Sequence, residues 1–171
     1  MGTIDTFAQR FGEGQRVTQF RVSGNIGGIG CSGVDQSFYV KSAQYPSSNI
    51  GIIEVPYRGR KIKMPGDRVF NEWTGSILLD QGNTMYDCMV GWMDWINSHS
   101  NVEALGISYK EDWEIQALDP FGSPNGAPVR LVGCWPAEVG TVDFNWETTD
   151  TIAEFSITLH FDYWMKDGAT T

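Results

Sequence analysis

The sequence is short of positive charge, and this shortage excludes one class of DNA-binding protein. Its 171 residues include 12 lysines and arginines against 21 aspartates and glutamates, which gives a formal net charge of -9 at pH 7. Proteins that bind DNA through a basic patch gain affinity by releasing phosphate counterions with lysine and arginine. We therefore expect no conventional DNA-binding patch on this chain.

Cysteine and histidine are also scarce. The cysteines, Cys31, Cys88 and Cys134, are odd in number and lack C-x-x-C spacing, so the sequence predicts reduced, buried thiols rather than a disulfide framework or a zinc site. Neither histidine, His99 or His160, lies in a motif that supplies a nucleophile or metal ligands. The sequence thus predicts no enzymatic activity, no catalytic residues, no bound metal and no cofactor.

Long apolar runs are missing as well. No stretch approaches the roughly 18 consecutive apolar residues of a membrane-spanning helix, and the chain does not begin with a signal-peptide pattern. We expect a protein made in the cytoplasm, without membrane anchoring.

Glycine, in contrast, is plentiful, and the stretch 24–33 includes a G-x-G-x-x-G motif at 28–33. In a dinucleotide site these glycines close a turn between a strand and a helix, so that the phosphates meet the helix N-terminus. Here the strand-like VDQSFYV follows, and no helix begins. The pattern favours a mobile loop or a bulged strand end.

Alternating apolar and polar residues predict a mainly β protein. The clearest run lies at 153–164, and TVDFNW at 141–146 repeats the pattern with Val142, Phe144 and Trp146 on its apolar face. Further strands are expected at 17–22, 36–45, 50–55, 60–64, 73–80, 113–118 and 129–135.

One stretch has helical rather than strand periodicity. Its large apolar residues recur at intervals of three or four positions: Met85, Met89, Trp92, Met93 and Ile96. We predict one substantial amphipathic helix at 84–98, capped by Asn83 or Thr84, that lies on the sheet. A short helix at 4–10 is a further candidate. A chain of this length fits a single domain, which buries roughly 70% of its unfolded surface.

The few cations are unevenly distributed. Five of the 12 fall within eleven positions: Arg58, Arg60, Lys61, Lys63 and Arg68. Residues 50–66 are predicted to form a hairpin that turns near residues 56–59 and extends from the domain. The cluster is either a subunit contact, where complementary charge sets register and partner choice, or an ordinary solvated face.

Three blocks of sequence carry a family resemblance. GDRVFNEW contains Gly66, Asp67, Arg68, Phe70 and Trp73; GCWPAEVGTVDFNW contains Gly133, Trp135, Pro136, Gly140 and Trp146; FSITLHFDYW ends with Asp162, Tyr163 and Trp164. In order and spacing they resemble the tail tube proteins of contractile-tailed bacteriophages, across residues 38–80 and 131–164. From their apolar setting, the tryptophans of these blocks are expected to hold the fold.

The resemblance implies a structural virion protein. Its fold would be a small β-barrel or sandwich of two packed antiparallel sheets with one flanking α-helix, as in type VI secretion tubes. It would be a single tail tube domain over 1–171, with an N-terminal arm at 1–16 and the hairpin near 50–66. Hexameric rings would stack into the inner tube of a contractile tail, which conducts DNA into the host. The implied partners are further copies, the tail sheath, baseplate and terminator proteins, and viral DNA that passes without specific binding.

The same reading predicts which residues meet neighbours and which line the bore. Subunit and ring contacts are expected at Arg58, Arg60, Lys61, Lys63, Asp67 and Arg68. Cations in a conduit would grip DNA, so acidic residues on polar strand faces are the candidates for the lumen: Asp143, Glu154 and Asp162. The subunit would assemble in the host cytoplasm and function in the virion tail.

Three other functions remain open from the sequence. A tube-initiating baseplate component and the tube of a phage-derived injection system share the implied fold. A carbohydrate-binding β-domain is a less favoured alternative, because sugars stack on exposed tryptophans.

Overall fold

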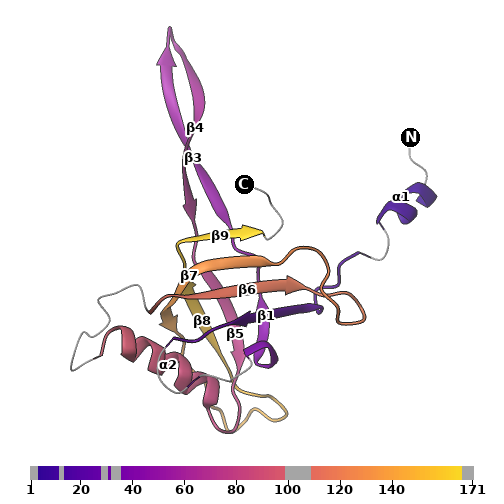
Figure 1. Ribbon diagram of the computed structural model, residues 1–171, viewed down its shortest axis with the longest axis vertical. Coiled ribbons are helices and arrows are strands. Elements are labelled where there is room, and N and C mark those ends of the chain that lie inside the picture. Colours follow the sequence, from indigo (N-terminus) through magenta and orange to yellow (C-terminus); the bar gives the residue numbers. More distant parts are fainter. Residues whose placement is uncertain (1–3, 12–13, 28–30, 32–35, 99–108, 167–171) are drawn as a thin grey trace.

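The computed structural model describes residues 4–11, 14–27, 31, 36–98 and 109–166, and its strands form two crossing layers (Figure 1). The first layer contains β1 (Phe20–Gly24), β6 (Glu111–Ala117), the first half of β7 (Val129–Val139) and β9 (Tyr163–Lys166). The second contains the remainder of β7, β8 (Glu154–His160), β5 (Trp73–Leu78) and β2 (Val40–Ala43), which a 3-10 turn (Gln36–Phe38) precedes. All pairings are antiparallel, and the predicted mainly β fold with a flanking helix is confirmed.

Strand β7 belongs to both layers. Residues 129–132 pair with β9, and residues 135–139 pair with β8. Between them Gly133 has a backbone φ of 71°, a left-handed value that glycine adopts without the steric cost of a Cβ atom. The two halves of one strand therefore run in different layers, and the core forms between these layers.

The core follows the predicted alternation. Along β8, Phe155, Ile157 and Leu159 are buried while the residues between them face outward. Trp73 of the second layer and Trp113 of the first pack with ring centroids 6.0 Å apart. Each buried indole also donates a hydrogen bond to a backbone carbonyl: Trp73 to Gln44 (2.6 Å), Trp92 to Tyr109 (2.9 Å) and Trp113 to Asn25 (2.8 Å). The tryptophans thus fix connecting segments to the sheets as well as filling the core.

Helix α2 (Thr84–Ile96) covers one side of the core. Its buried residues, Met85, Cys88, Met89 and Trp92, recur at the predicted helical spacing. Asn83 occupies the N-cap position, as predicted, but its side chain makes no capping hydrogen bond; instead the Asp80 carboxylate accepts hydrogen bonds from the Thr84 backbone N–H (2.8 Å) and hydroxyl (2.7 Å). The hydrogen bond from the Thr84 hydroxyl is the main cause of the lowered pKa of Asp80.

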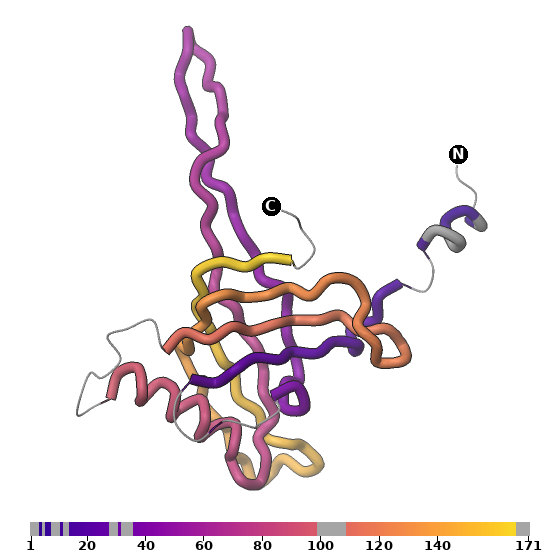
Figure 2. The backbone as a smooth tube through the Cα atoms, viewed as in Figure 1, coloured from indigo at the N-terminus to yellow at the C-terminus, as the bar shows by residue number. Residues whose placement is uncertain are grey.

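A long hairpin projects from the domain along its longest axis (Figures 1 and 2). It consists of β3 (Ser48–Tyr57) and β4 (Arg60–Phe70), and we call it the arm. Arg58 and Gly59 make the turn with positive φ values of 46° and 77°, as two-residue hairpin turns require. A register shift near Gly51 and Gly66 interrupts the ladder, and such bulges bend a ribbon. Helix α1 (Ile4–Phe11) also stands away from the body.

The strand predicted at 141–146 is wrong. This segment is a loop, in which the side chains of Phe144 and Trp146 are 78% and 103% exposed, so Trp146 does not hold the fold. The physical reason lies in the pairing of β8. The end of β7 occupies one side of β8 and β5 the other, so residues 141–146, which connect β7 to β8, cannot pair beside β8. The predicted run at 153–164 is also divided, because the chain turns at Asp162 between β8 and β9.

The expectation of three reduced thiols is wrong as well. Cys31 and Cys88 form a disulfide with 5.8 Å between their Cα atoms, which joins the segment after β1 to helix α2. Their separation of 57 positions in the sequence leaves no local spacing signal. Cys134 is a free, buried thiol, and desolvation raises its pKa to about 12.

Thiol titration of protein purified without reductant tests this arrangement. We expect no reactive thiol in the native protein at pH 8, because Cys134 is inaccessible and protonated. In denaturant we expect one thiol per chain, and three after reduction. The Cys134→Ala variant should show none before reduction. Three thiols in denaturant alone would contradict the disulfide.

Candidate functional site

The arm has one apolar face that its own chain leaves uncovered. Cross-strand register places five large side chains on this face, each at least 40% exposed: Ile53, Val55, Tyr57, Ile62 and Met64. The opposite face carries charged side chains of both strands, and Lys61 pairs there with Glu54 at 2.7 Å. A two-stranded hairpin is marginally stable alone, and a contiguous exposed apolar patch typically marks an interaction site. The arm therefore has the character of a contact element.

The predicted contact residues lie in two different places. Arg58 and Arg60 lie at the tip of the arm, and no ion pair is found for either within the described ranges. Arg58 lies over the Tyr57 ring, 5.4 Å from its centroid. Lys61 and Lys63 occupy the polar face of the hairpin, and Asp67 lies at the bulge.

Arg68, in contrast, is bound to its own chain at the base of the arm. Its guanidinium lies 5.2 Å from the Phe70 ring centroid and 5.5 Å from that of Trp164, and it donates hydrogen bonds to the Ser48 hydroxyl. Phe70 in turn packs on Phe161 at 6.3 Å. The first and third sequence blocks therefore meet here and fix the arm to the domain.

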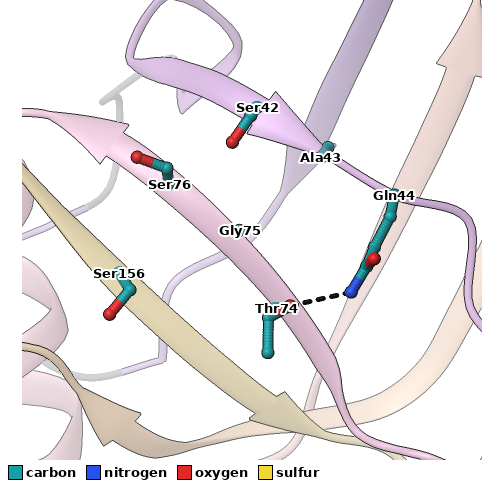
Figure 3. A pocket seen from close by; sticks show the side chains of 7 residues that line it. All are labelled: Ser42, Ala43, Gln44, Thr74, Gly75, Ser76 and Ser156. Carbon is teal, nitrogen blue, oxygen red and sulfur yellow. Dashed lines mark hydrogen bonds between the residues drawn. The ribbon is translucent and has the colours of Figure 1, made fainter.

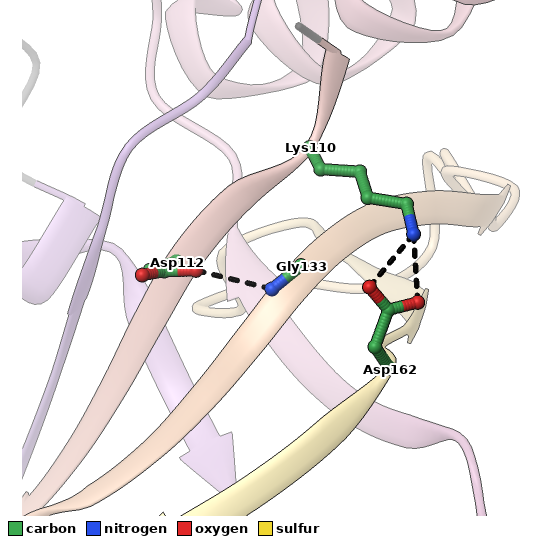
Figure 4. A network of polar contacts seen from close by, with 4 residues as sticks. All are labelled: Lys110, Asp112, Gly133 and Asp162. Atoms are coloured by element: carbon green, nitrogen blue, oxygen red, sulfur yellow. Dashed lines mark hydrogen bonds and ion pairs between the residues drawn. The ribbon is translucent and has the colours of Figure 1, made fainter. Parts of the chain in front are cut away.

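The second and third blocks meet where β7 crosses between layers (Figure 4). The Lys110 ammonium donates to both carboxylate oxygens of Asp162 at 2.7 Å, and this hydrogen bond raises the pKa of Lys110. The Gly133 N–H donates to Asp112 at 3.0 Å, and Asp112 pairs with Arg130 at 2.7 Å. Gly133 therefore lies between two ion pairs, Lys110–Asp162 and Arg130–Asp112.

The remaining block residues also have structural positions. Pro136 is buried, the Trp135 ring lies 5.1 Å from the imidazole of His160, and Tyr163 is 42% exposed. The Gly140 N–H donates to the Ser156 carbonyl at 2.7 Å, and a Cβ atom at Gly140 would collide with the Ser156 side chain. Gly140 therefore permits the close approach of β7 to β8.

The outer face of the second layer is lined by hydroxyl and amide groups (Figure 3). It forms an open hollow of about 420 Å³, and we call it the hydroxyl face; its lining residues are Ser42, Ala43, Gln44, Thr74, Gly75, Ser76 and Ser156. The Gln44 amide donates to Thr74 at 2.8 Å. At its edge Lys41 and Glu154 pair at 2.6 Å, and the hydrogen bond from Lys41 lowers the pKa of Glu154. The face therefore presents polar groups and one internally balanced ion pair.

The three predicted lumen residues do not share a face. Glu154 borders the hydroxyl face, Asp162 lies at the turn between β8 and β9, and Asp143 lies in the loop after β7. The sequence missed the hydroxyl face because its residues come from β2, β5 and β8, whose adjacency no local pattern reveals. Alternation did place Ser156 on the polar side of its strand.

The described parts of the chain contain no group of three or more histidine, cysteine or acidic side chains that could hold a metal. None of their helices has the length and apolar character needed to cross a membrane. His160 lies 4.0 Å from Glu72 on the outer face, whereas His99 and most of the glycine motif at 28–33 lie outside the described residues.

Comparisons with known proteins agree on one family. The family described as "Phage tail tube protein" matches residues 15–167. The tail tube protein of Serratia phage KSP90 is 26% identical over 176 residues, covering 98% of each chain. The tail tube protein of Enterobacteria phage T4 is 26% identical over 134 residues, covering 77% of this chain and 82% of its own.

A solved structure shares the fold. A chain in the sheath-tube complex of an extracellular contractile injection system, in its extended state, superposes with a TM-score of 0.65. Sequence identity is 22%, and the match covers 96% of this chain and 97% of the other.

Substitution of Gly133 tests the crossing of β7. A Cβ atom there would lie 2.5 Å from an Asp162 carboxylate oxygen, so Gly133→Ala adds a clash to the left-handed strain. Gly122→Ala is the matched control, because Gly122 also has a positive φ of 81° but open space around it. We expect a loss of about 1–2 kcal/mol in the free energy of unfolding for Gly122→Ala, and about 1–3 kcal/mol more for Gly133→Ala. Urea unfolding measures both, and equal losses would contradict this account.

Proposed function

Since the chain belongs to the phage tail tube protein family, we propose that six copies form a ring and that rings stack into the hollow inner tube of a contractile tail. Its function is structural, and its location is the virion tail. We place its assembly in the host cytoplasm. The tail sheath, baseplate and tail-terminator proteins are its proposed partners, together with viral DNA that passes through the tube unbound.

Ring closure is supported by two open strand edges on the second layer. Among the described strands, β2 pairs only with β5, and residues 135–139 of β7 pair only with β8. An unpaired edge is a template for another strand, so β2 of one subunit can continue the sheet of the next. Pro136 is compatible with this position, because proline occurs on edge strands and at bulges.

Six copies give a bore of useful width. Each subunit contributes four strands to the second layer, and neighbouring strands lie about 4.8 Å apart. The closed sheet then has a circumference of about 115 Å and a width of about 37 Å between opposite backbones. The ring is therefore wide enough for side chains and a passing duplex.

The main support for the proposal is the uncharged polar character of the hydroxyl face. If the second layer forms the barrel wall, this face lines the bore, because the other face of the layer is the core. DNA carries one negative charge for about every 1.7 Å of its axis, so unpaired lysines there would bind it and slow its passage. Hydroxyl groups do not, and Lys41 is already paired with Glu154. Of the three acidic candidates, Glu154 is the one we retain beside the lumen.

The arm then serves contacts between subunits, through Arg58, Arg60, Lys61 and Lys63. We assign no enzymatic activity to the chain. Trp146 is exposed, as a carbohydrate-binding domain would require, but the family match favours the tube.

Electron microscopy of the purified protein tests the tube directly. We expect regular hollow filaments of uniform width whose length increases with protein concentration. Single rings that never stack would indicate a baseplate initiator instead. A protein that stays monomeric at high concentration would contradict the proposed function.

A lysine in the bore should turn a neutral conduit into one that retains DNA. Thr74→Lys places one new cation per subunit on the hydroxyl face, and we expect its tubes to retain duplex DNA at low salt and release it as salt increases. Ser123→Lys, in the exposed turn between β6 and β7, is the matched control and should retain none. Ultraviolet absorbance of sedimented tubes measures the bound DNA. Equal retention by the two variants would show that the hydroxyl face does not line the bore.

A further inference from the structure

A second exposed apolar surface lies on the loop between β7 and β8. Its large side chains, Phe144, Trp146 and Ile152, are 78%, 103% and 65% exposed. The loop has internal order, since the Glu147 N–H donates to the Asn145 side chain at 2.9 Å. Clusters of exposed apolar side chains typically mark interaction sites on proteins.

A groove borders this loop. It has a volume of about 350 Å³ and is lined by Leu79, Asn83, Tyr86, Thr141, Val142 and Phe144. Tyr86 packs edge-on against Phe155 of the core with ring centroids 5.3 Å apart, which fixes one wall. We call residues 79–87 and 140–153 together the distal surface. It offers an apolar recess beside protruding aromatic side chains.

The distal surface and the arm carry opposite charge. Residues 140–153 contain Asp143, Glu147 and Asp150 and no lysine or arginine, and residues 79–87 add Asp80 and Asp87. The arm has arginines at its tip beside its apolar face. The two surfaces thus match in both apolar character and sign of charge.

The two surfaces also lie at opposite ends of the molecule. Along the longest axis, the tip of the arm is at one end, and the loop between β7 and β8 is at the other (Figures 1 and 2). Within one subunit they cannot meet. Two copies in the same orientation, stacked along this axis, bring the arm of one toward the distal surface of the next.

We propose that the distal surface is the docking site for the arm of a second copy in the adjacent ring. This inference rests on the proposed function, since it names the surface that receives the arm in the stacked tube. The apolar face of the arm covers the groove and Trp146, and Arg58 and Arg60 meet the carboxylates around them. Such a head-to-tail contact does not close, so it extends into a filament.

Charge reversal on each side gives a reciprocal test. The first variant combines Arg58→Glu with Arg60→Glu, and the second combines Asp143→Lys with Glu147→Lys; no ion pair within the described ranges involves these four residues. Each variant alone should form rings that do not stack, because like charges then face each other. An equimolar mixture should recover tubes of wild-type length, because each variant's arm is complementary to the other's distal surface.

A matched control separates position from net charge. Asp94→Lys with Glu114→Lys makes the same change in net charge as the second variant, but outside the distal surface. It should form tubes as the wild type does, measured by filament length in electron micrographs. Circular dichroism of all variants should match the wild type.

The remaining outcomes each overturn the inference. Normal tubes from the second variant alone, or a mixture that remains as single rings, would show that the arm docks elsewhere. Normal tubes that no longer bind the sheath protein would assign the distal surface to the sheath. Failure of the wild type to form any tube would instead contradict the proposed function.

Discussion

At Gly133 the chain adopts a left-handed backbone conformation that carries β7 from one layer of strands into the other. The core lies between the two layers, and the hydroxyl face, the open edges and the base of the arm all take their positions from the second layer. Asp112 accepts the Gly133 N–H, and the Lys110–Asp162 pair occupies the space that a side chain at position 133 would need. The crossing of β7 between the layers therefore depends both on the glycine at position 133 and on aspartates that are distant from it in sequence.

The same alternation that builds the core also explains the proposed bore. Along β5 and β8, every second residue is buried against the first layer, so the residues between them must face outward together. Serine and threonine occupy the middle of this row, at Thr74, Ser76, Ser156 and Thr158, and suit β-structure without adding charge, while Glu154 is paired with Lys41. One strand pattern thus serves a dry interior on one side and a neutral wet surface on the other. The arm and the distal surface, in contrast, both carry large exposed apolar side chains.

The sequence predicted those features that depend on local pattern. Helix α2 spans 84–96 against the expected 84–98, and the apolar residues of 153–159 enter the core as their alternation indicates. Features that depend on spatial neighbours were missed. The Cys31–Cys88 disulfide joins residues without local spacing, and the hydroxyl face combines three strands. Residues 141–146 have strand periodicity, but both edges of the adjacent β8 are already paired, so periodicity alone misplaced Trp146 in the core.

The uneven distribution of cations has a physical explanation in this arrangement. Arg68 already has partners within its own chain, because its guanidinium stacks on Phe70 and Trp164 and holds the base of the arm. Arg58 and Arg60 lie farther along the same hairpin, where Arg58 lies over the ring of its neighbour Tyr57 and no ion pair is found for either arginine in the described part of the chain. An acidic subunit repels its copies at long range, and a local cationic arm reverses that repulsion only where the arm meets the acidic end of another copy. In the proposed tube, charge that favours stacking is thereby kept away from the hydroxyl face, where the same cations would bind DNA and oppose its transport.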